Sequence, residues 1–332
     1  MIAHESLYLS SLRMSRELFT RLRERSRLNA LIRSFFDSRD MLEVSTPIMS
    51  SSGNTDINVD SFESHYSGPI SGGPKTRWLR TSPEFALKRL MAAGIGDVFE
   101  IGPVFRNGEF GPRHNPEFTM LEWYREGFDQ HRLMNEVAAF ISVVSNAFGR
   151  PIGEIGYFSY RELYLHYLQI DVFTAVMAEL ERPLRDYSIN LDQLSRDDLL
   201  DLLRTHCIEP QINADAVFFV YDFPASQAAL AKIRLDDIPV AERFELYLGP
   251  IEMANGYHEL GDPIELRARF ERDQQIRAAR GQSVLCIDEN LLSALPKMPA
   301  CAGVALGVER LHQWLIRAPD LSVVMPLRFD QA

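Results

Sequence analysis

The polar residues between two apolar stretches in the first half of the chain offer the densest set of chemical groups. Residues 105–118 read Phe-Arg-Asn-Gly-Glu-Phe-Gly-Pro-Arg-His-Asn-Pro-Glu-Phe, with Arg106 at the end of one predicted strand and Arg113 across a hairpin loop. Guanidinium groups pair with phosphate oxygens and stabilise the charge that develops on an α-phosphate under attack, so this arrangement suits a nucleoside triphosphate. A solvated hairpin tip is the alternative that these residues alone leave open.

A second set consists of four carboxylates, Glu242, Glu245, Glu252 and Glu259, spread over strand-like sequence. Carboxylates at this density can coordinate Mg2+ beside phosphates or bind an ammonium group, and they would repel one another without a cation. An acidic strand that faces solvent is the alternative. Because Glu245 and Glu252 are seven residues apart, one continuous strand would place them on opposite faces, so a shared site requires a bend near residues 249–250.

The third set is the segment Gly303-Val304-Ala305-Leu306-Gly307-Val308-Glu309-Arg310. Small residues at alternate positions leave one face of a strand bare, so that a flat ring can approach the backbone and Arg310 can stack on its other face. Close packing between a strand and a helix is the alternative.

The remaining segments predict the elements that position these sets. Apolar residues recur at three- and four-residue steps from 16 to 37, which predicts an amphipathic helix before a short strand at 41–44 and Pro47. Residues 51–76, around an alternating stretch at 57–62, predict a loop with one strand or hairpin. Strands are also predicted at 98–105, 118–124, 217–222, 244–253 and 304–308, and helices at 84–93, 131–148, 160–168, 197–206, 266–280 and after 308. Strands paired across loops, with helices grouped around them, predict an α+β fold with an antiparallel sheet flanked by helices.

Composition narrows the possible functions. The chain has 332 residues, 46% of them hydrophobic, and a formal net charge of −11, which argues against an extensive nonspecific grip on nucleic-acid backbones. Its apolar runs end well short of the roughly 20 residues that cross a bilayer. The first 20 residues lack the apolar core of a secretory signal, so we expect a cytoplasmic protein with no membrane partner. Cys207, Cys286 and Cys301 show no metal-ligand spacing and are expected to be buried, reduced thiols.

Taken in order, the sets resemble the signature motifs of class II aminoacyl-tRNA synthetases. Residues of about 16–50 resemble motif 1, the dimer-forming element, about 98–125 resemble motif 2, and about 300–316 resemble motif 3. The run Arg-His-Asn-Pro-Glu-Phe-Thr-Met at 113–120 is similar to that of lysyl-tRNA synthetases in particular. The resemblance implies one catalytic domain over residues 1–332 with a helical insertion at about 150–212, a homodimer, and the use of ATP and Mg2+.

The resemblance also implies roles for individual residues. It makes Arg106 and Arg310 the catalytic arginines, on the α-phosphate and over the adenine ring, with further ATP contacts from Asn107, Glu109, His114, Asn115, Phe118, Glu252, Met253 and Gly307. It implies Mg2+ binding by Glu245 and Glu252. The implied amino-acid pocket consists of Ser82, Pro83, Glu84, Glu122, Tyr124, Asn255, Glu259 and Ala305, with Glu259 and Tyr124 at the side-chain amine. A buried carboxylate opposite that amine selects sharply, because a substrate without the charge leaves it unpaired.

Several positions depart from the lysyl-tRNA synthetase pattern. Ala305 stands where motif 3 usually has glycine, and Ser82 stands where alanine is common, so the pocket changes around the α and β carbons of the amino acid. Residues 223–227, Phe-Pro-Ala-Ser-Gln, replace the usual Pro-x-x-x-Ser-Pro-Leu type of segment, and no anticodon-binding domain is expected ahead of motif 1. In these features the chain is similar to the elongation factor P lysine ligases.

That similarity implies that the chain forms an adenylate of (R)-β-lysine and transfers the β-lysyl group to the ε-amine of a lysine on elongation factor P. A truncated lysyl-tRNA synthetase that activates L-lysine is one alternative. A catalytically silent paralogue that acts as a binding subunit is the other, although a pure binding module has no need for phosphate-binding and metal-binding groups together. Pyrophosphate exchange with each amino acid separates the three hypotheses.

Two further departures lie in the nucleotide motifs. Gly108 stands where the family has glutamate, so either Glu109 takes that contact or adenine recognition is weakened. Glu309 replaces the usual aspartate before Arg310 and is one methylene longer. Neither change removes a group that adenylate formation requires, so we expect an active enzyme.

Overall fold

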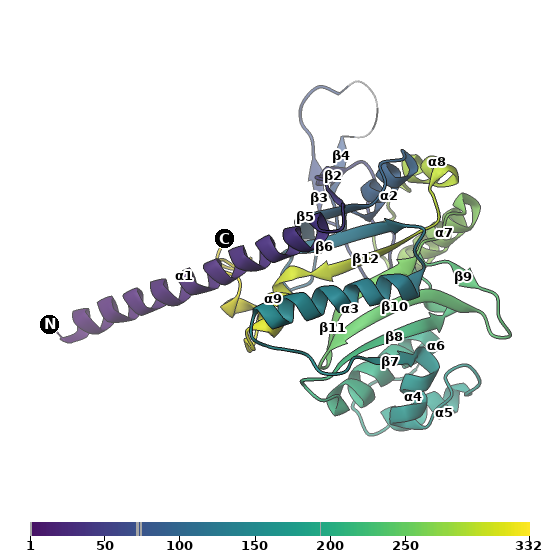
Figure 1. Ribbon diagram of the computed structural model, residues 1–332. Helices are drawn as coiled ribbons and strands as arrows, with labels where there is room; N and C mark the ends of the chain where they lie inside the picture. The colour runs from purple at the N-terminus through teal and green to yellow at the C-terminus, as the bar shows by residue number, and fades with distance from the viewer. Residues whose placement is uncertain (1, 71–72, 74, 193) are drawn as a thin grey trace.

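A large sheet organises the chain, as Figure 1 shows. The computed structural model describes residues 2–70, 73, 75–192 and 194–332, with side chains from residue 16 onward. Among these residues the large sheet runs in the order β1-β5-β6-β12-β11-β10-β8-β7, with β9 beside β10. Its strands are β1 (Leu42–Glu43), β5 (Val98–Phe105), β6 (Glu117–Glu126), β7 (Gly156–Ser159), β8 (Val217–Pro224), β9 (Ile233–Arg234), β10 (Val240–Leu248), β11 (Ile251–His258) and β12 (Cys301–Gly307).

Most neighbouring strands of this sheet are antiparallel. The consecutive pairs from β5 to β8 run antiparallel, whereas β1 pairs with β5, and β7 with β8, in parallel at the two ends. The predicted α+β fold with an antiparallel sheet flanked by helices is therefore confirmed, with parallel pairs added at its edges.

The amphipathic pattern at 16–37 belongs to a longer helix, α1 (Ile2–Asp37). Near its C-terminal end Leu28, Ile32 and Phe36 are fully buried, and the ring of Phe36 stacks on that of Phe99 in β5 at 4.6 Å between centroids. β1 follows directly and pairs with β5. The helix therefore anchors on the strands that carry the predicted motif 2.

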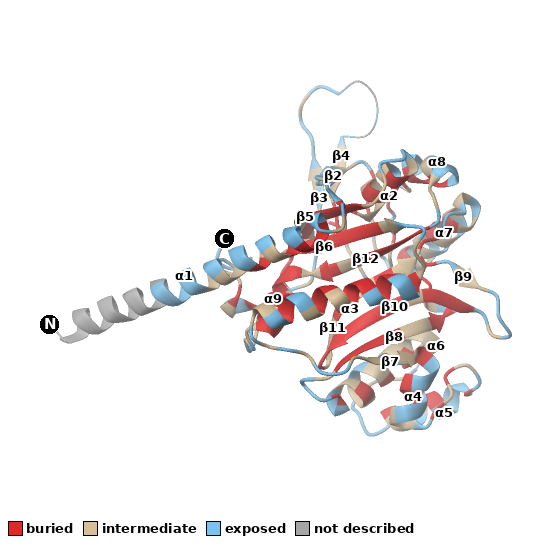
Figure 2. Cartoon of the chain, in the orientation of Figure 1, coloured by how far each residue is buried: buried red, intermediate tan, exposed pale blue. Residues whose placement is uncertain are grey.

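Helix α3 (Gln130–Ala147) covers one face of the large sheet, where Figure 2 shows the buried residues concentrated. Val137 and Phe140 of α3 pack in one core with Leu121 and Trp123 of β6. Because side chains alternate between the two faces of a strand, the intervening Glu122 must point to the opposite face. This alternation separates the core from the functional face of the sheet.

A second, smaller sheet consists of β2 (Met49–Ser50), β4 (Thr76–Leu79) and β3 (Glu63–His65). The loop with one strand or hairpin predicted for residues 51–76 is confirmed, and its strand begins at Glu63, just after the alternating stretch at 57–62. The preceding loop is shaped by local side-chain bonds, because the backbone N–H groups of Asp56 and Asn58 donate to Asn54 Oδ1 and Asp56 Oδ1 at 3.0 and 2.7 Å. Such bonds compete with a strand ladder.

The chain turns sharply between β10 and β11. Gly249 adopts a positive φ of 61°, and a side chain there would meet the carbonyl oxygen of Ala214 at 2.7 Å from its Cβ. The segment predicted as strand over 244–253 is thus two strands, and the bend required at 249–250 is present. It places Glu245 opposite Asn255 and Tyr247 opposite Glu252, so both carboxylates belong to one face.

Helices cover the rest of the sheet. They include α2 (Glu84–Ala92), α7 (Pro263–Ala279), α8 (Glu289–Ala294) and α9 (Val308–Leu315). Residues 150–212 carry α4 (Tyr160–Leu168), α5 (Met177–Glu181) and α6 (Arg196–Leu202), but also β7, so this segment extends the sheet as well as covering it. Short turns of helix are η1 (Arg182–Leu184), η2 (Leu203–Ile208), η3 (Glu209–Gln211), η4 (Ala225–Gln227), η5 (Leu295–Lys297) and η6 (Leu321–Val323). None of the helices in the described part of the chain has the length and apolar character that a membrane span needs.

Candidate active site

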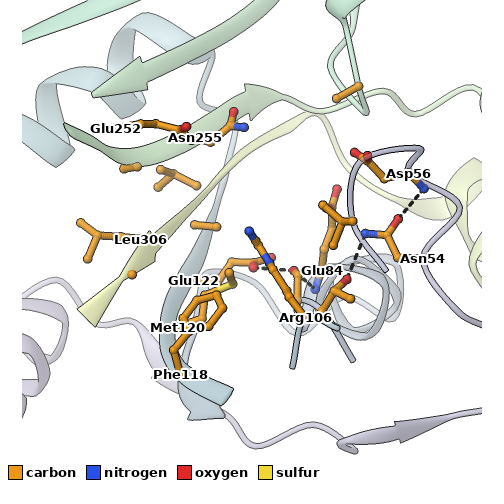
Figure 3. Close-up of a pocket in the computed structure, with 18 of the residues that line it drawn as sticks. Asn54, Asp56, Glu84, Arg106, Phe118, Met120, Glu122, Glu252, Asn255 and Leu306 are labelled. Carbon is orange, nitrogen blue, oxygen red and sulfur yellow. Dashed lines mark hydrogen bonds between the residues drawn. The ribbon is translucent and has the colours of Figure 1, made fainter. Parts of the chain in front are cut away.

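A cavity of about 250 Å3, open to solvent, lies on the face of the sheet opposite α3. Three adjacent strands form its floor, because Asn255 of β11, Ala305 of β12 and Glu122 of β6 are direct neighbours in register. Helices α2, α7 and α9, the loop between β5 and β6 and the loop that precedes β3 contribute to its walls. Figure 3 shows Arg106, Glu122, Asn255 and Asp56 converging on this space from four separate segments.

Two arginines that are far apart in sequence face this cavity. Arg310 donates from Nη1 to the carbonyl oxygen of Glu252 at 3.1 Å, and its Nη2 lies 2.7 Å from Nε2 of His114. The guanidinium of Arg106 lies 5.2 Å from the ring centroid of Phe118. Burial lowers the pKa of Arg310, Glu252 opposes this shift, and the positive charge of Arg106 adds to it. Crowding of two cations at one cavity favours an anionic ligand between them.

The other end of the cavity holds three carboxylates, and two of them share a buried cation. Lys88 Nζ lies 2.5 Å from Glu84 Oε1 and 2.6 Å from Glu259 Oε2. Burial disfavours the charge of Lys88, but Glu259 and Glu84 raise its pKa well above its ordinary value. Lys88 therefore stays protonated. Sequence reasoning missed it, although its position four residues after Glu84 on a helix could have signalled the pair.

The third carboxylate is held by two hydroxyl groups. Ser82 donates to Glu122 Oε2 at 2.6 Å and Tyr124 donates to Glu122 Oε1 at 2.8 Å. Tyr124 lies against Gly303, where even a Cβ would come within 2.3 Å of the tyrosine ring and 2.6 Å of Glu259 Oε1. The bare position at Gly303 therefore lets Glu122, Tyr124 and Glu259 gather at one place.

These carboxylates resist ionisation in the empty cavity. Burial, the charge of Glu84 and that of Glu259 raise the pKa of Glu122 to about 8, against the bonds from Ser82 and Tyr124. Burial and Glu84 likewise raise the pKa of Glu259 to about 8, although Lys88 opposes the shift. A ligand that carries ammonium groups would relieve this repulsion.

Glu252 and Glu245 form a carboxylate pair beside the cavity, of which Glu252 alone lines it. Glu245 accepts from Arg243 Nη2 at 2.6 Å and from the Tyr247 hydroxyl at 2.8 Å. Burial raises the pKa of Glu252, and the charge of Glu245 raises it further. A buried carboxylate pair at a cavity wall fits Mg2+ that is held jointly with nucleotide phosphates. Magnesium binding by Glu245 stays a prediction, and it would require Arg243 to release the carboxylate.

The cavity brings together most of the residues that the sequence singled out, namely Ser82, Glu84, Arg106, Glu109, His114, Asn115, Phe118, Glu122, Tyr124, Glu252, Met253, Asn255, Glu259, Ala305, Gly307 and Arg310. Three others do not line it. Pro83 caps α2, Asn107 donates its backbone N–H to Asp60 at 2.8 Å in the neighbouring loop, and Glu245 lies behind Glu252. Direct ligand contact by these three residues stays a prediction, and a strand-like pattern does not reveal which residues a neighbouring loop covers.

Two of the cavity residues also have structural bonds. Asn115 donates to the carbonyl oxygen of Glu117 at 2.7 Å and accepts from the backbone of Phe329 at 3.1 Å, so it anchors the loop to the C-terminal segment. Glu109 lies 3.9 Å from Arg106 and 4.0 Å from His114. It thus lines the cavity beside two predicted ATP contacts, while Gly108 adopts a turn with a φ of 82°.

The cavity also has walls that the sequence did not indicate. Asn54, Thr55 and Asp56 come from the loop before β3, and Asp273 comes from α7. Arg277 of α7 ties these two segments together by donating to the carbonyl oxygen of Asp56 at 2.7 Å. The sequence of α7 did not single out Asp273 as a cavity residue, because many exposed helices carry acidic residues.

Comparison with known families agrees with this geometry. A model described as tRNA synthetases class II (D, K and N) matches residues 4–328. The chain belongs to this family. Family membership supports an ATP-dependent role in activating an amino acid, and thus a ligase activity in general. Class II synthetases generally use ATP and Mg2+, which agrees with the two arginines and Glu252 at one end of the cavity.

Proposed function

We propose that this class II synthetase activates (R)-β-lysine with ATP and transfers the β-lysyl group to the ε-amine of a lysine on elongation factor P. The observation that carries the proposal is the charge at the inner end of the cavity. Glu84 and Glu259 share the ammonium group of Lys88, whereas Glu122 is held by the neutral hydroxyls of Ser82 and Tyr124. Among the described residues, two negative charges are therefore left at this end when all three carboxylates are ionised. Two ammonium groups, as found in a diamino acid, would match them.

The wall beside these charges supports a lysine isomer with a displaced amine. Ala305 lies between Asn255 and Glu122 on the cavity floor and adds a methyl group where the family usually has glycine. At the same wall, the hydroxyl of Ser82 donates a hydrogen bond to Glu122. These two side chains occupy space near the backbone carbons of the substrate, which favours a β-amino acid over L-lysine.

The first step needs alignment and charge stabilisation more than acid or base catalysis. The substrate carboxylate is already ionised and attacks the α-phosphorus of ATP, and pyrophosphate leaves. Arg106 would stabilise the charge on the α-phosphate, and Arg310 would hold the nucleotide from the opposite side. Bound Mg2+ would neutralise phosphate charge beside Glu252.

Pyrophosphate exchange tests the proposal directly. We expect ATP–pyrophosphate exchange that depends on (R)-β-lysine and is much weaker with L-lysine. Incubation of elongation factor P with the enzyme, ATP and (R)-β-lysine should then add the mass of one β-lysyl group. Preference for L-lysine would favour a lysyl-tRNA synthetase activity instead, and no exchange with either amino acid would favour a silent paralogue.

We also propose that the protein is a homodimer. Leu18, Phe19 and Leu22 lie within five residues of one another on α1 and are 40%, 57% and 45% exposed. Apolar side chains of this size, exposed on one helix, favour burial against a second copy.

A further inference from the structure

Three polar side chains of the cavity wall are not among the residues assigned above to ATP or the amino acid. Thr55 and Asp56 lie on the loop before β3, and Asp273 lies on α7. All three line the same cavity as the catalytic arginines. Figure 3 shows the carboxylate of Asp56 on the cavity side of its loop.

Thr55 is the observation that points to a ligand. Its side chain is 2% exposed, and among the described residues its hydroxyl oxygen has no hydrogen-bond partner. A buried hydroxyl without a partner costs free energy and is rare in native proteins. Its position on the cavity wall indicates that a polar group of a ligand completes it.

Asp273 offers an available carboxylate in the wall of the same cavity. Within the part of the chain that the structure describes, no hydrogen bond or ion pair involves this side chain, although Arg269 and Arg277 of the same helix are bonded to other groups. Burial and the charge of Asp56 raise the pKa of Asp273 to about 6, against Arg272, Arg269 and Arg277. Asp273 is therefore ionised at pH 7 yet more basic than an ordinary aspartate, as a general base requires.

This trio lies at the amino-acid end of the cavity. Burial raises the pKa of Tyr257, Arg243 opposes the shift, and the charges of Glu84, Glu259 and Asp56 all add to it. Asn54 Nδ2 donates to Thr81 Oγ1 at 2.9 Å, and the backbone N–H of Asp56 donates to Asn54 Oδ1 at 3.0 Å. The loop that carries Asp56 is therefore bonded to the residue before Ser82, whereas Arg310 and His114 mark the nucleotide end.

We propose that Thr55, Asp56 and Asp273 form the subsite for the acceptor of the second step, a primary ammonium group on a lysine side chain. The inference rests on the proposed function, because it assumes that an aminoacyl adenylate is formed in the cavity. Two carboxylates and a hydroxyl acceptor suit the three N–H bonds of an ammonium group.

The subsite also accounts for the protons of the transfer step. Asp273 takes one proton from the acceptor ammonium, and the neutral amine attacks the carbonyl carbon of the adenylate. The C–N bond forms, and the bond from that carbon to the phosphate oxygen breaks with release of AMP. The nitrogen loses its second proton to Asp56, which leaves a neutral amide. Both carboxylates then return their protons to solvent.

A competition between two nucleophiles tests the inference. The enzyme is first loaded with ATP and (R)-β-lysine, then mixed at pH 7 with either Nα-acetyl-lysine amide or hydroxylamine. The first acceptor is an ammonium ion that must lose a proton, whereas hydroxylamine is already neutral. Mass spectrometry measures the amide and the hydroxamate, and the ratio of their initial rates reports the need for a base.

We expect Asp273→Asn to lower this ratio by about 100-fold, the low end of the effect of a general base. The matched control is Glu271→Gln, which removes an exposed carboxylate from the same helix and should leave the ratio unchanged. Hydroxamate formation by Asp273→Asn shows that the variant is folded and makes adenylate. A ratio within twofold of the unmodified enzyme, or no amide from the unmodified enzyme with this acceptor, would overturn the subsite. Failure of the unmodified enzyme to form hydroxamate would refute the proposed function itself.

Discussion

The ammonium group of Lys88 lies 2.6 Å from a carboxylate oxygen of Glu259, and both side chains are 1% exposed. The same ammonium group also contacts Glu84, so one buried cation serves two carboxylates of the cavity. The positive charge of Lys88 holds the two carboxylates together, but one cation cannot neutralise both of them. Selectivity for a cationic substrate follows from this incomplete compensation.

Removal of this cation should destabilise the protein. Lys88→Met leaves Glu84 and Glu259 buried without their partner, and we expect the free energy of unfolding to fall by about 3 kcal/mol at pH 8. The loss should shrink at pH 6, where protonation relieves the repulsion. Denaturant titration at both pH values measures this, with the exposed Lys297→Met as control. Equal losses at the two pH values would contradict the electrostatic cause.

Glu259 should determine the affinity for the amino acid more than that for ATP. Glu259→Gln removes one of the two charges left for the substrate, so we expect kcat/KM for (R)-β-lysine to fall by about 100-fold, as expected for loss of one buried charged partner. The KM for ATP should change by less than threefold, since Arg106 and Arg310 lie at the other end. Steady-state pyrophosphate exchange separates the two constants. Glu154→Gln, an exposed carboxylate, is the control, and a parallel rise in both KM values would argue against this division of the cavity.

Substrate binding should release protons. The pKa of Glu122 and that of Glu259 are raised from the ordinary value of 4.5 to about 8, so both carboxyl groups are largely protonated in the empty cavity at pH 7. A substrate with two ammonium groups favours the ionised forms, and affinity should therefore increase as the pH rises from 6.5 towards 8. Titration calorimetry at pH 7 in phosphate and in Tris buffer measures the protons released. Equal heats in the two buffers would show that no proton moves.

The same shifts have an opposite effect on the stability of the empty enzyme. These carboxyl groups hold protons more tightly in the folded than in the unfolded chain, so their contribution is complete below pH 4.5 and is lost as the pH rises through 8. Substrate should therefore stabilise the enzyme more at pH 8 than at pH 6. Thermal unfolding with and without (R)-β-lysine provides the check.

Arg106 should be essential for adenylate formation. Arg106→Ala removes a charge from the α-phosphate site, and we expect pyrophosphate exchange to fall by about 100- to 1000-fold with an unchanged circular-dichroism spectrum. Arg89→Ala, at an exposed position on α2, is the matched control. Exchange near the normal rate in Arg106→Ala would refute the assigned role.

The exposed side chains of α1 should support the dimer. Phe19→Glu combined with Leu22→Glu places charges on the apolar surface, and light scattering should then report the mass of a single chain. Thr20→Glu alone, on the same helix, tests whether any added charge has this effect. If light scattering shows that the unmodified protein is a monomer, the proposed dimer is refuted.

The sequence by itself determined the fold and most of the catalytic side of the cavity. Periodicity located α1, α3 and the β5–β6 pair, and the seven-residue spacing of Glu245 and Glu252 required the bend that Gly249 makes. Local patterns suffice here, because alternation along a strand and recurrence along a helix fix which side chains share a face.

Only the tertiary structure decided which residues surround these faces of the strands and helices. Glu245 is held by Arg243 and Tyr247, and Asn107 is turned towards Asp60, because neighbouring strands and loops cover positions that the strand pattern leaves open. In the sequence, Lys88 and Asp273 look like ordinary charged residues of helices. Only the tertiary structure pairs Lys88 with Glu259 and places Asp273 in the wall of the cavity. The charge state of a side chain depends on its burial and on contacts distant in sequence, and these are properties of the folded chain.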